Sequence, residues 1–291
     1  MDGFLLVDKA GGMTSHDVVA KVRRRLGTKK VGHAGTLDPM ATGVLVLGIG
    51  NATRLLQYVV DGTKEYSATI SLGKATVTDD VEGEVVFTAK AGQRASVSDE
   101  AITNVLNGMV GVIAQRPSSV SAIKVDGKSA HQRVRDGEVV ELPAREVTIE
   151  SITIHGITHG TDEISIDVTV KCSAGTYIRA IARDLGEALE VGGHLTRLHR
   201  TLVSPFAIDE CASWEEAELI TTASGISRIL PTRVLAPDEL NEISFGRVIP
   251  ANPSESVTAA LTSAGDFAAL LENKTLGSQI YATPSLVAVK G

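Results

Sequence analysis

The stretch K-E-Y-S-A-T-I-S-L, residues 64–72, has apolar side chains at every second position, namely Tyr66, Ala68, Ile70 and Leu72. A period of two is typical of a β-strand that buries one face. Residues 163–172 repeat the pattern, with apolar side chains at Ile164, Ile166, Val168, Val170 and Cys172. These two stretches predict neighbouring strands of a sheet that packs one face against a core.

Helical patterns separate the predicted strands. Thr14 or Ser15 is a suitable cap for a helix that runs through Leu26 and stops at Gly27. The same signals of apolar periodicity and capping predict further helices from Asn51 to about Val60, over 98–110, and from the turn at Gly175 to near Gly192. Short strands alternating with single helices predict an α+β fold with a mixed, mostly antiparallel sheet and flanking helices.

The character of the chain changes after about residue 210. An acidic helix is predicted over 213–220, and a passage rich in Ser, Thr, Ala and Gly follows at 221–227. The last sixty residues contain short apolar runs such as F-A-A-L-L. We therefore predict one large domain over residues 1–228 and a small β-rich domain over 229–291.

Charge is spread unevenly over the 291 residues, whose formal net charge is −7. Residues 1–60 carry eight Lys/Arg against four Asp/Glu, a net of +4, and residues 171–200 carry five against three, a net of +2. Local basic patches decide nucleic-acid binding, so the acidic mean does not exclude RNA. The short apolar runs and the absence of a signal-peptide pattern predict a cytoplasmic protein that does not enter a membrane.

Metal chemistry is not indicated by the sequence. Cys172 and Cys211 are far apart, and the seven histidines form no metal-ligand pattern. We expect a protein without a metal and without a cofactor.

The loop G-H-A-G-T-L-D-P-M-A-T-G, residues 32–43, contains a single carboxylate, Asp38. Asp followed by Pro is a common helix start, with the aspartate as N-cap and the proline as first helical residue. Glycines on both sides, however, also allow close approach of a ligand to the backbone. Asp38 is therefore either a helix cap or a reactive carboxylate.

Aspartate, arginine and two tyrosines occur at predicted strand edges and helix starts: Asp38, Tyr66, Tyr177 and Arg179. Such a set suits a planar, uncharged ring that is held by stacking and attacked by a carboxylate. Each residue also has an ordinary interpretation, since a strand tyrosine is commonly a core residue and a loop imidazole such as that of His33 commonly lies at the surface.

Five segments occur in an order and spacing that resemble one protein family. They are L-L-V-D-K-A-G-G-M-T-S at 5–15, G-H-A-G-T-L-D-P-M-A-T-G-V-L at 32–45, K-E-Y at 64–66, S-A-G-T-Y-I-R at 173–179 and G-G-H-L-T-R-L-H-R-T at 192–201. This set is similar to that of the bacterial tRNA pseudouridine-55 synthases, the TruB family. The resemblance covers residue 4 to about 208 and implies the pseudouridine-synthase fold.

The resemblance implies a reaction and its catalytic residues. Uridine 55 in the T loop of tRNA would be flipped out and isomerised to pseudouridine, with Asp38 as the nucleophile. Tyr66 would stack on the uracil, and Arg179 would pair with the aspartate. Attack at C6 of the uracil and attack at C1′ of the ribose both remain open, and the chemistry requires no cofactor.

The resemblance also implies substrate contacts. His33 would contact the RNA loop that the base has left, Tyr177 would lie in the active site, and Leu198 would form an apolar wall of the uracil pocket. Basic side chains would hold RNA phosphates, and those we expect to do so are Lys9, Lys21, Arg24, Lys29 and Lys30. A solvated helix face is the ordinary interpretation of this basic segment.

Two positions depart from the family pattern. R-P-S-S-V-S-A at 116–122 has Ser118 and Val120 where the family usually has a second proline and an aromatic residue. The predicted domain over 229–291 resembles an RNA-binding appendage of the PUA kind only loosely.

Two other functions are compatible with parts of the sequence. A non-catalytic tRNA-binding or RNA-folding protein would need the basic segment but not Asp38. A glycosidase would need two carboxylates at about 5–9 Å, and the matched loops offer only Asp38. The tRNA T arm is the one partner we expect; no protein partner is implied, and we expect a monomer.

Overall fold

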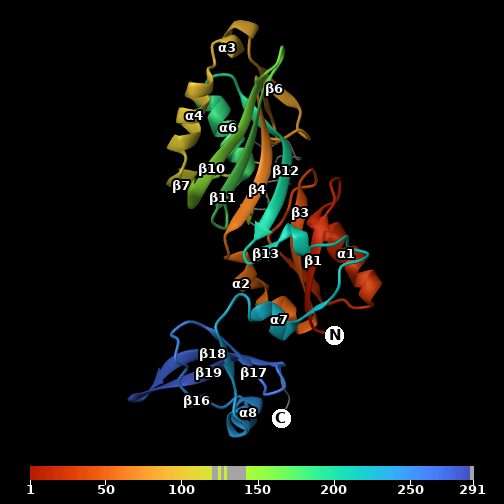
Figure 1. The fold of residues 1–291 in the computed structure, drawn as a ribbon, viewed down its shortest axis with the longest axis vertical. Coiled ribbons are helices and arrows are strands. Elements are labelled where there is room, and N and C mark those ends of the chain that lie inside the picture. Colours follow the sequence, from red (N-terminus) through yellow and green to blue (C-terminus); the bar gives the residue numbers. More distant parts are fainter. Residues whose placement is uncertain (120–123, 126–127, 130–141, 289–291) are drawn as a thin grey trace.

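The computed structural model describes residues 1–119, 124–125, 128–129 and 142–288. Within them ten strands form one sheet, whose main path is β14-β1-β3-β12-β4-β11-β10-β7, with β2 added on β3 and β13 on β12 (Figure 1). The bounds are β1 Gly3–Lys9, β2 Val31–Ala34, β3 Thr42–Ile49, β4 Lys64–Leu72, β7 Gly111–Gln115, β10 Arg145–His159, β11 Ile164–Cys172, β12 Gly193–Val203, β13 Phe206–Ala207 and β14 Ile220–Thr221.

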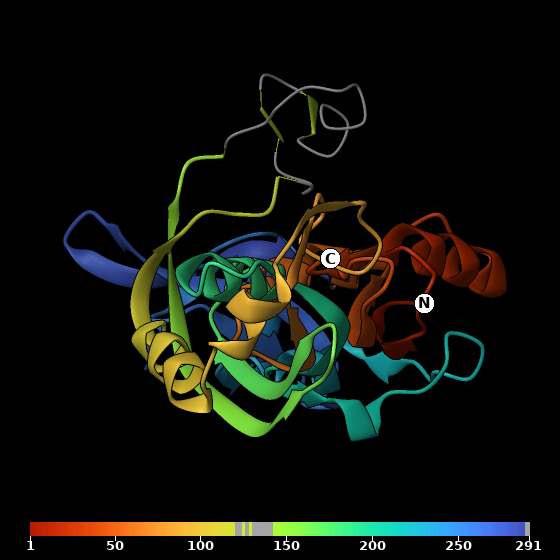
Figure 2. The same ribbon diagram turned by 90° about the horizontal axis from the view of Figure 1, so that it is seen from above.

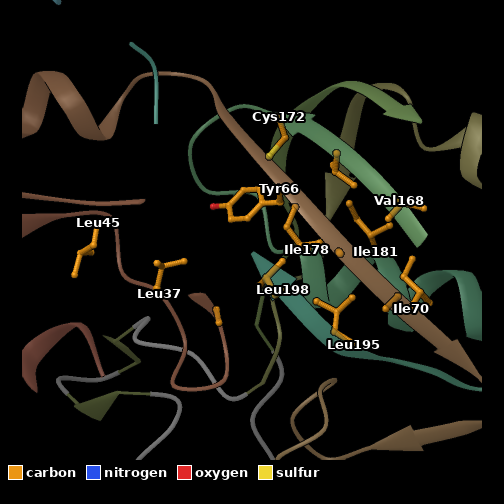
Figure 3. Packing of buried hydrophobic residues seen from close by; sticks show 14 of the residues in the cluster. Leu37, Leu45, Tyr66, Ile70, Val168, Cys172, Ile178, Ile181, Leu195 and Leu198 are labelled. Carbon is orange, nitrogen blue, oxygen red and sulfur yellow. The ribbon is translucent and has the colours of Figure 1, made fainter. Parts of the chain in front are cut away.

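Strand β4 lies in the middle of this sheet, between β11 and β12. Tyr66 is paired with Val170 on one side and with Arg200 on the other. The predicted buried faces of both stretches, from Tyr66 to Leu72 and from Ile164 to Cys172, are buried in one apolar cluster, part of which is drawn in Figure 3. The alternation in the sequence thus predicted both strands and the faces that they bury.

One strand joins the two halves of the sheet. β12 pairs antiparallel with β4 along its length, and its residues His199 and Arg200 pair parallel with Thr42 and Gly43 of β3. The other pairings of this sheet in the described residues are antiparallel, so the predicted mixed, mostly antiparallel α+β fold is confirmed. Because the loop before β3 ends at this junction, it lies next to β12, which separates β3 from β4.

Helices α1 and α4 lie far apart, toward opposite ends of the sheet (Figures 1 and 2), and both contribute side chains to the same apolar cluster. The bounds are α1 Ser15–Leu26, α2 Leu56–Val60, α3 Ala91–Ala95, α4 Asp99–Gly108, α6 Ile178–Ala188, α7 Thr222–Ile226 and α8 Pro237–Ser244, with 3₁₀ turns η1 Gly50–Leu55 and η2 Ile208–Glu210. Two short antiparallel strand pairs complete the described elements of this region, β5 Lys74–Thr76 with β6 Val85–Thr88 and β8 Lys124–Val125 with β9 Lys128–Ser129.

The first helix begins and ends as its sequence predicts. Thr14 is the N-cap, and its hydroxyl accepts a hydrogen bond from the Asp17 amide while the Asp17 carboxylate accepts from the Thr14 amide. This reciprocal capping box satisfies two amides that the helix leaves unpaired. Gly27 ends the helix at φ 62°, a left-handed conformation that glycine adopts without a Cβ clash.

Two predicted helices differ from the structure. Residues 213–220 form no helix: a turn lies at 214–216 and β14 begins at Ile220, while the carbonyls of Trp214 and Ala217 accept hydrogen bonds from the guanidinium of Arg25 on α1. Tertiary contacts outweigh local propensity here. The segment predicted to begin at Asn51 begins as a 3₁₀ turn, and the Asn51 amide group donates to Asp2 rather than capping.

A second sheet occupies the end of the molecule shown at the bottom of Figure 1. Its order is β15-β17-β18-β19-β16, with bounds β15 Thr232–Val234, β16 Ile249–Pro250, β17 Thr258–Leu261, β18 Phe267–Leu276 and β19 Gln279–Val287. It has an apolar core of its own, and it also packs on the first sheet through a cluster that contains both Phe4 and Leu270. The predicted β-rich character is present, while the boundary between residues 228 and 229 stays a prediction.

In the part of the chain that the structure describes, no helix is both long and apolar enough to cross a membrane.

Candidate active site

Asp38 and Arg179 form a bidentate ion pair. The Nε of Arg179 lies 2.9 Å from Asp38 Oδ2, and its Nη2 lies 3.1 Å from Oδ1. Asp38 lies in the segment between β2 and β3, and Arg179 is the second residue of α6. No helix begins at Asp38, so the interpretation as an N-cap is wrong; the segment from 38 to 41 has no helical assignment, and the carboxylate faces the guanidinium.

A cavity of about 260 Å³ opens beside this pair. It is lined by the loop 35–38, by Val60, by residues of the strands β4 and β12, and by the segment 173–179. Five of the six residues expected to act on or bind the substrate line it: Asp38, Tyr66, Tyr177, Arg179 and Leu198. The sheet thus brings together residues up to 160 positions apart in the sequence.

Tyr66 stands on the buried face of β4 and is 9% exposed. Its ring lies near Ile178 and Leu198, and its hydroxyl points away from Ile70 and Val168, toward the side of Leu37 and Leu45 (Figure 3). Burial raises the pKa of the Tyr66 phenol, against the opposing effect of the Arg200 guanidinium, which also hydrogen-bonds the tyrosine. The phenol is therefore protonated at neutral pH, and its ring offers a flat apolar wall to the cavity.

Two buried cations, Lys64 and Arg200, also line the cavity, and neither was predicted to have a role there. The Arg200 side chain donates from Nε to the Val44 carbonyl at 2.8 Å and from Nη2 to the Gly35 carbonyl at 3.1 Å. Lys64 donates to the carbonyls of Val60 and Gly62, and burial lowers its pKa to about 8. Both residues stand inside the segments that carried the family resemblance, which was the only signal that could have singled them out.

A second carboxylate faces Arg179. Asp80 Oδ2 lies 3.6 Å from Arg179 Nε, and the Asp80 side chain is 3% exposed. On its other side, Asp80 Oδ1 accepts hydrogen bonds from the Thr78 hydroxyl and from the Glu82 amide. Sequence reasoning missed Asp80 because T-D-D at 78–80 reads as an ordinary acidic turn. Since Asp80 does not line the cavity, it does not provide the exposed second carboxylate that a glycosidase would use.

The third guanidinium nitrogen of Arg179, Nη1, donates hydrogen bonds to groups other than Asp38. Arg179 Nη1 donates to the Thr78 carbonyl at 2.5 Å and to the Ser118 hydroxyl at 3.1 Å. Ser118 is one of the two departures from the family pattern and is fully buried. The other departure, Val120, lies outside the described residues.

The turn before α6 fixes Tyr177. Gly175 has φ 83°, as expected for the tight turn predicted there. Gln115 on β7 then accepts from the Tyr177 amide at 2.8 Å and donates to its carbonyl at 3.1 Å. This paired backbone contact ties the start of α6 to the edge of the sheet.

His33 is not among the residues that line the cavity. Its ring meets that of His16 edge to face, with centroids 5.4 Å apart. Burial, together with the nearby His16 and Arg200, lowers the pKa of His33, so its imidazole is neutral at pH 7.

The basic residues that we expected to contact phosphates differ in exposure and in the partners of their side chains. Lys9 is fully buried and donates to the carbonyls of Ala10, Met13 and Pro39, so the predicted phosphate contact of Lys9 is wrong. It instead ties the first loop to the residue after Asp38. Lys21 is half-buried, and its Nζ lies 4.8 Å from the centre of the Trp214 ring.

Arg24, Lys29 and Lys30 are exposed, as a phosphate contact requires. Among the described residues, no group of three or more His, Cys, Asp and Glu side chains is arranged to hold a metal ion.

Comparison with known proteins identifies similar chains. The model of the TruB family pseudouridylate synthase N-terminal domain matches residues 23–178, and that of the tRNA pseudouridylate synthase B C-terminal domain matches residues 179–237. The tRNA pseudouridine synthase B of Paenarthrobacter aurescens is 49% identical, with 100% of this chain and 96% of that protein covered. The protein of the same name from Corynebacterium diphtheriae is 48% identical, with 97% of each chain covered.

Solved structures share the fold. A chain in the structure of an H/ACA RNP bound to a substrate RNA containing 2′-deoxyuridine superposes with a TM-score of 0.70 at 21% identity, covering 99% of this chain and 85% of that one. A chain of a Cbf5-Nop10-Gar1 complex gives the same TM-score at 24% identity, with the same coverage.

Proposed function

The chain belongs to the TruB family of pseudouridylate synthases, and we propose that it converts uridine to pseudouridine at position 55 in the T loop of tRNA. In this reaction the N1–C1′ bond of the nucleoside breaks and a C5–C1′ bond forms. The proton of C5 leaves and N1 gains one, so nothing is oxidised or reduced. The protein therefore has to supply a nucleophile, a site for the detached uracil and contacts that bind the RNA.

The observation that carries this proposal is the bidentate pair of Asp38 and Arg179 beside the cavity. The Asp38 side chain is 34% exposed whereas that of Arg179 is 4% exposed, so a base can reach the carboxylate but not displace the guanidinium. Arg179 fixes the direction in which the oxygens point, as a planar fork does for a carboxylate. Asp38 acts as the nucleophile, either at C6 of the uracil or at C1′ of the ribose.

The cavity would receive the flipped base. Extrusion of a nucleotide costs a few kcal/mol, and stacking of the uracil on an aromatic ring returns roughly 1–3 kcal/mol of this. The Tyr66 ring supplies that surface, and Leu198 closes the cavity with an apolar wall. A cavity of about 260 Å³ suits a single pyrimidine ring rather than a whole nucleotide.

The rest of the T arm would lie on the surface around the cavity. His33 would meet the RNA loop where the base has left, and the exposed Arg24, Lys29 and Lys30 would hold phosphates. These contacts position the RNA by its shape and charge and read little sequence. The proposal includes a monomeric enzyme that works in the cytoplasm with tRNA as its partner.

An unmodified tRNA transcript labelled with tritium at C5 of uridine tests the proposal, because isomerisation releases the C5 hydrogen. Wild type should release the label, and Asp38→Asn should release none while binding the transcript normally. Asp167→Asn is the matched control, since this exposed carboxylate bonds only Thr69 on the sheet in the described contacts. A transcript with cytidine at position 55 should lose the signal in wild type.

A non-catalytic tRNA-binding protein would give a different result. It would bind the transcript and release no tritium in wild type, and Asp38→Asn would then be indistinguishable from it. Tritium release from the transcript with cytidine at position 55 would instead support a pseudouridine synthase and refute position 55 as its target.

A further inference from the structure

Ser118 is a buried hydroxyl that contacts the catalytic ion pair from the side away from the cavity. The residue is fully buried and does not line the cavity. Its Oγ accepts from Arg179 Nη1 at 3.1 Å and donates toward the Thr78 carbonyl at 3.3 Å. Burial raises the pKa of Asp79, and the Ser118 hydroxyl, whose one proton is shared between the Thr78 carbonyl and the Asp79 carboxylate, opposes this shift.

The guanidinium of Arg179 is thus divided between two sets of acceptors. Nε and Nη2 donate to the oxygens of Asp38, while Nη1 donates to the Thr78 carbonyl and to Ser118. Because the guanidinium is planar, acceptors on both edges fix its plane as well as its position. The acceptors on Nη1 would remain in place when the acceptors on the other edge change.

The acceptors on the other edge do change in the proposed reaction. When Asp38 bonds to a carbon of the nucleoside, one oxygen leaves the pair and the carboxylate loses its negative charge. The attraction between Asp38 and Arg179 weakens at that moment. The hydrogen bonds from Nη1 to Thr78 and Ser118 then contribute more of the interaction that keeps Arg179 in place. Asp80, at 3.6 Å from Nε, would then compete to draw the guanidinium toward itself.

We propose that Ser118 is a positioning residue, which holds Arg179 in the plane of Asp38 while the covalent bond to the substrate forms and breaks. The inference rests on the proposed function of the same site. It also gives a role to the departure from the family pattern, because the proline usual at this position has no hydroxyl and cannot accept from Nη1. The alternative is that Ser118 merely fills the space behind Arg179.

Ser118→Ala and Ser118→Cys test the role in the full-length protein. Alanine removes the acceptor; cysteine keeps the approximate volume but accepts hydrogen bonds only weakly, and it remains informative if the alanine variant unfolds. Tritium release from a uridine-labelled tRNA transcript gives kcat and KM, and a filter assay gives the affinity for the transcript. Thermal unfolding of each variant shows whether it is folded.

We expect both variants to lose about tenfold in kcat, which corresponds to roughly 1.4 kcal/mol, with KM and affinity within twofold of wild type. Ser71→Ala is the matched control, because Ser71 is also a buried serine, donates to Glu163 at 2.7 Å and lies outside the cavity lining. It should leave kcat unchanged. A role in packing alone would lower the melting temperature and leave kcat of the folded protein as it was.

Wild-type kcat in folded Ser118→Ala or Ser118→Cys would overturn the inference and leave the proposed function standing. A loss that appears in KM rather than in kcat would also overturn it, since the hydroxyl would then act on binding. Failure of the wild type to release tritium would refute the proposed function itself, and the two failures are therefore told apart in one experiment.

Discussion

Replacing Arg179 by lysine keeps the positive charge beside Asp38 and removes the planar fork. Arginine reaches both oxygens of Asp38, at 2.9 and 3.1 Å, whereas an ammonium group is a single point donor. The variant therefore keeps the Coulomb attraction and loses one of two charge-assisted hydrogen bonds. Such a bond contributes roughly 1.5–3 kcal/mol, which predicts a loss in kcat of roughly 10- to 150-fold.

The buried carboxylate of Asp80 determines how much a substitution of Arg179 lowers the stability of the fold. Arg179→Lys leaves a cation near Asp80, which is 3% exposed, and should lower the melting temperature only slightly. Arg179→Gln leaves that buried carboxylate without a cation, and breaking a buried pair in this way costs about 3–5 kcal/mol. Because Asp38 is 34% exposed and screened by water, most of this cost comes from Asp80.

Single-turnover tritium release with saturating enzyme separates these effects, since it reports the chemical step free of product release. Arg197→Lys is the control, because Arg197 is exposed on β12 and donates to Ser67 and Thr69 rather than to a carboxylate. It should change neither the rate nor the melting temperature. A single-turnover rate for Arg179→Lys within twofold of wild type would show that charge alone suffices and that the bidentate geometry does not matter.

Three further predictions concern groups outside the pair. Burial lowers the pKa of Lys9 from 10.5 to about 8, so between these pH values the unfolded chain holds a proton that the folded chain has lost, and the stability contributed by Lys9 rises with pH. The melting temperature of wild type should therefore rise relative to that of Lys9→Met between pH 8 and 10.5. Parallel curves of melting temperature against pH for the two proteins would contradict this prediction. Changing Arg24, Lys29 and Lys30 together to alanine should reduce the slope of log affinity for tRNA against log salt by up to about 3 and leave kcat at saturation intact, whereas an unchanged slope would place the phosphates elsewhere. Burial raises the pKa of the Cys172 thiol to about 11, so iodoacetamide at pH 8 should label it only after unfolding, as mass spectrometry of the native protein would show.

Local patterns predicted the elements whose side chains repeat with one period. The alternation at 64–72 and the capping signals around 14–27 gave β4 and α1 almost residue by residue. The acidic segment at 213–220 has helix-forming residues, but its carbonyls bind Arg25 from a helix nearly 190 positions earlier. A window of local sequence contains no information about such a partner, so propensity gave the wrong element there.

The two interpretations of Asp38 show the same limit at a functional residue. Asp-Pro is a sound capping signal, and the loop sequence cannot tell whether a helix follows it. The outcome depends on Arg179, 141 positions later, which takes both carboxylate oxygens. Lys9 is the opposite case, because a lysine near a basic segment suggested a surface contact while its ammonium group is buried among three carbonyls.

Gly43 explains why the separate parts of the site meet at all. Its φ is 102°, and a Cβ at this position would lie 2.2 Å from the Arg200 carbonyl oxygen, so only glycine lets β3 approach β12 this closely. The parallel pairing of Gly43 with Arg200 carries the Asp38 loop to β12, and Arg200 is paired in turn with Tyr66 on β4. The side chain of Arg200 then donates to the Gly35 carbonyl of the same loop. One backbone junction and the buried guanidinium of Arg200 thus bring the proposed nucleophile, Asp38, close to the proposed stacking ring of Tyr66.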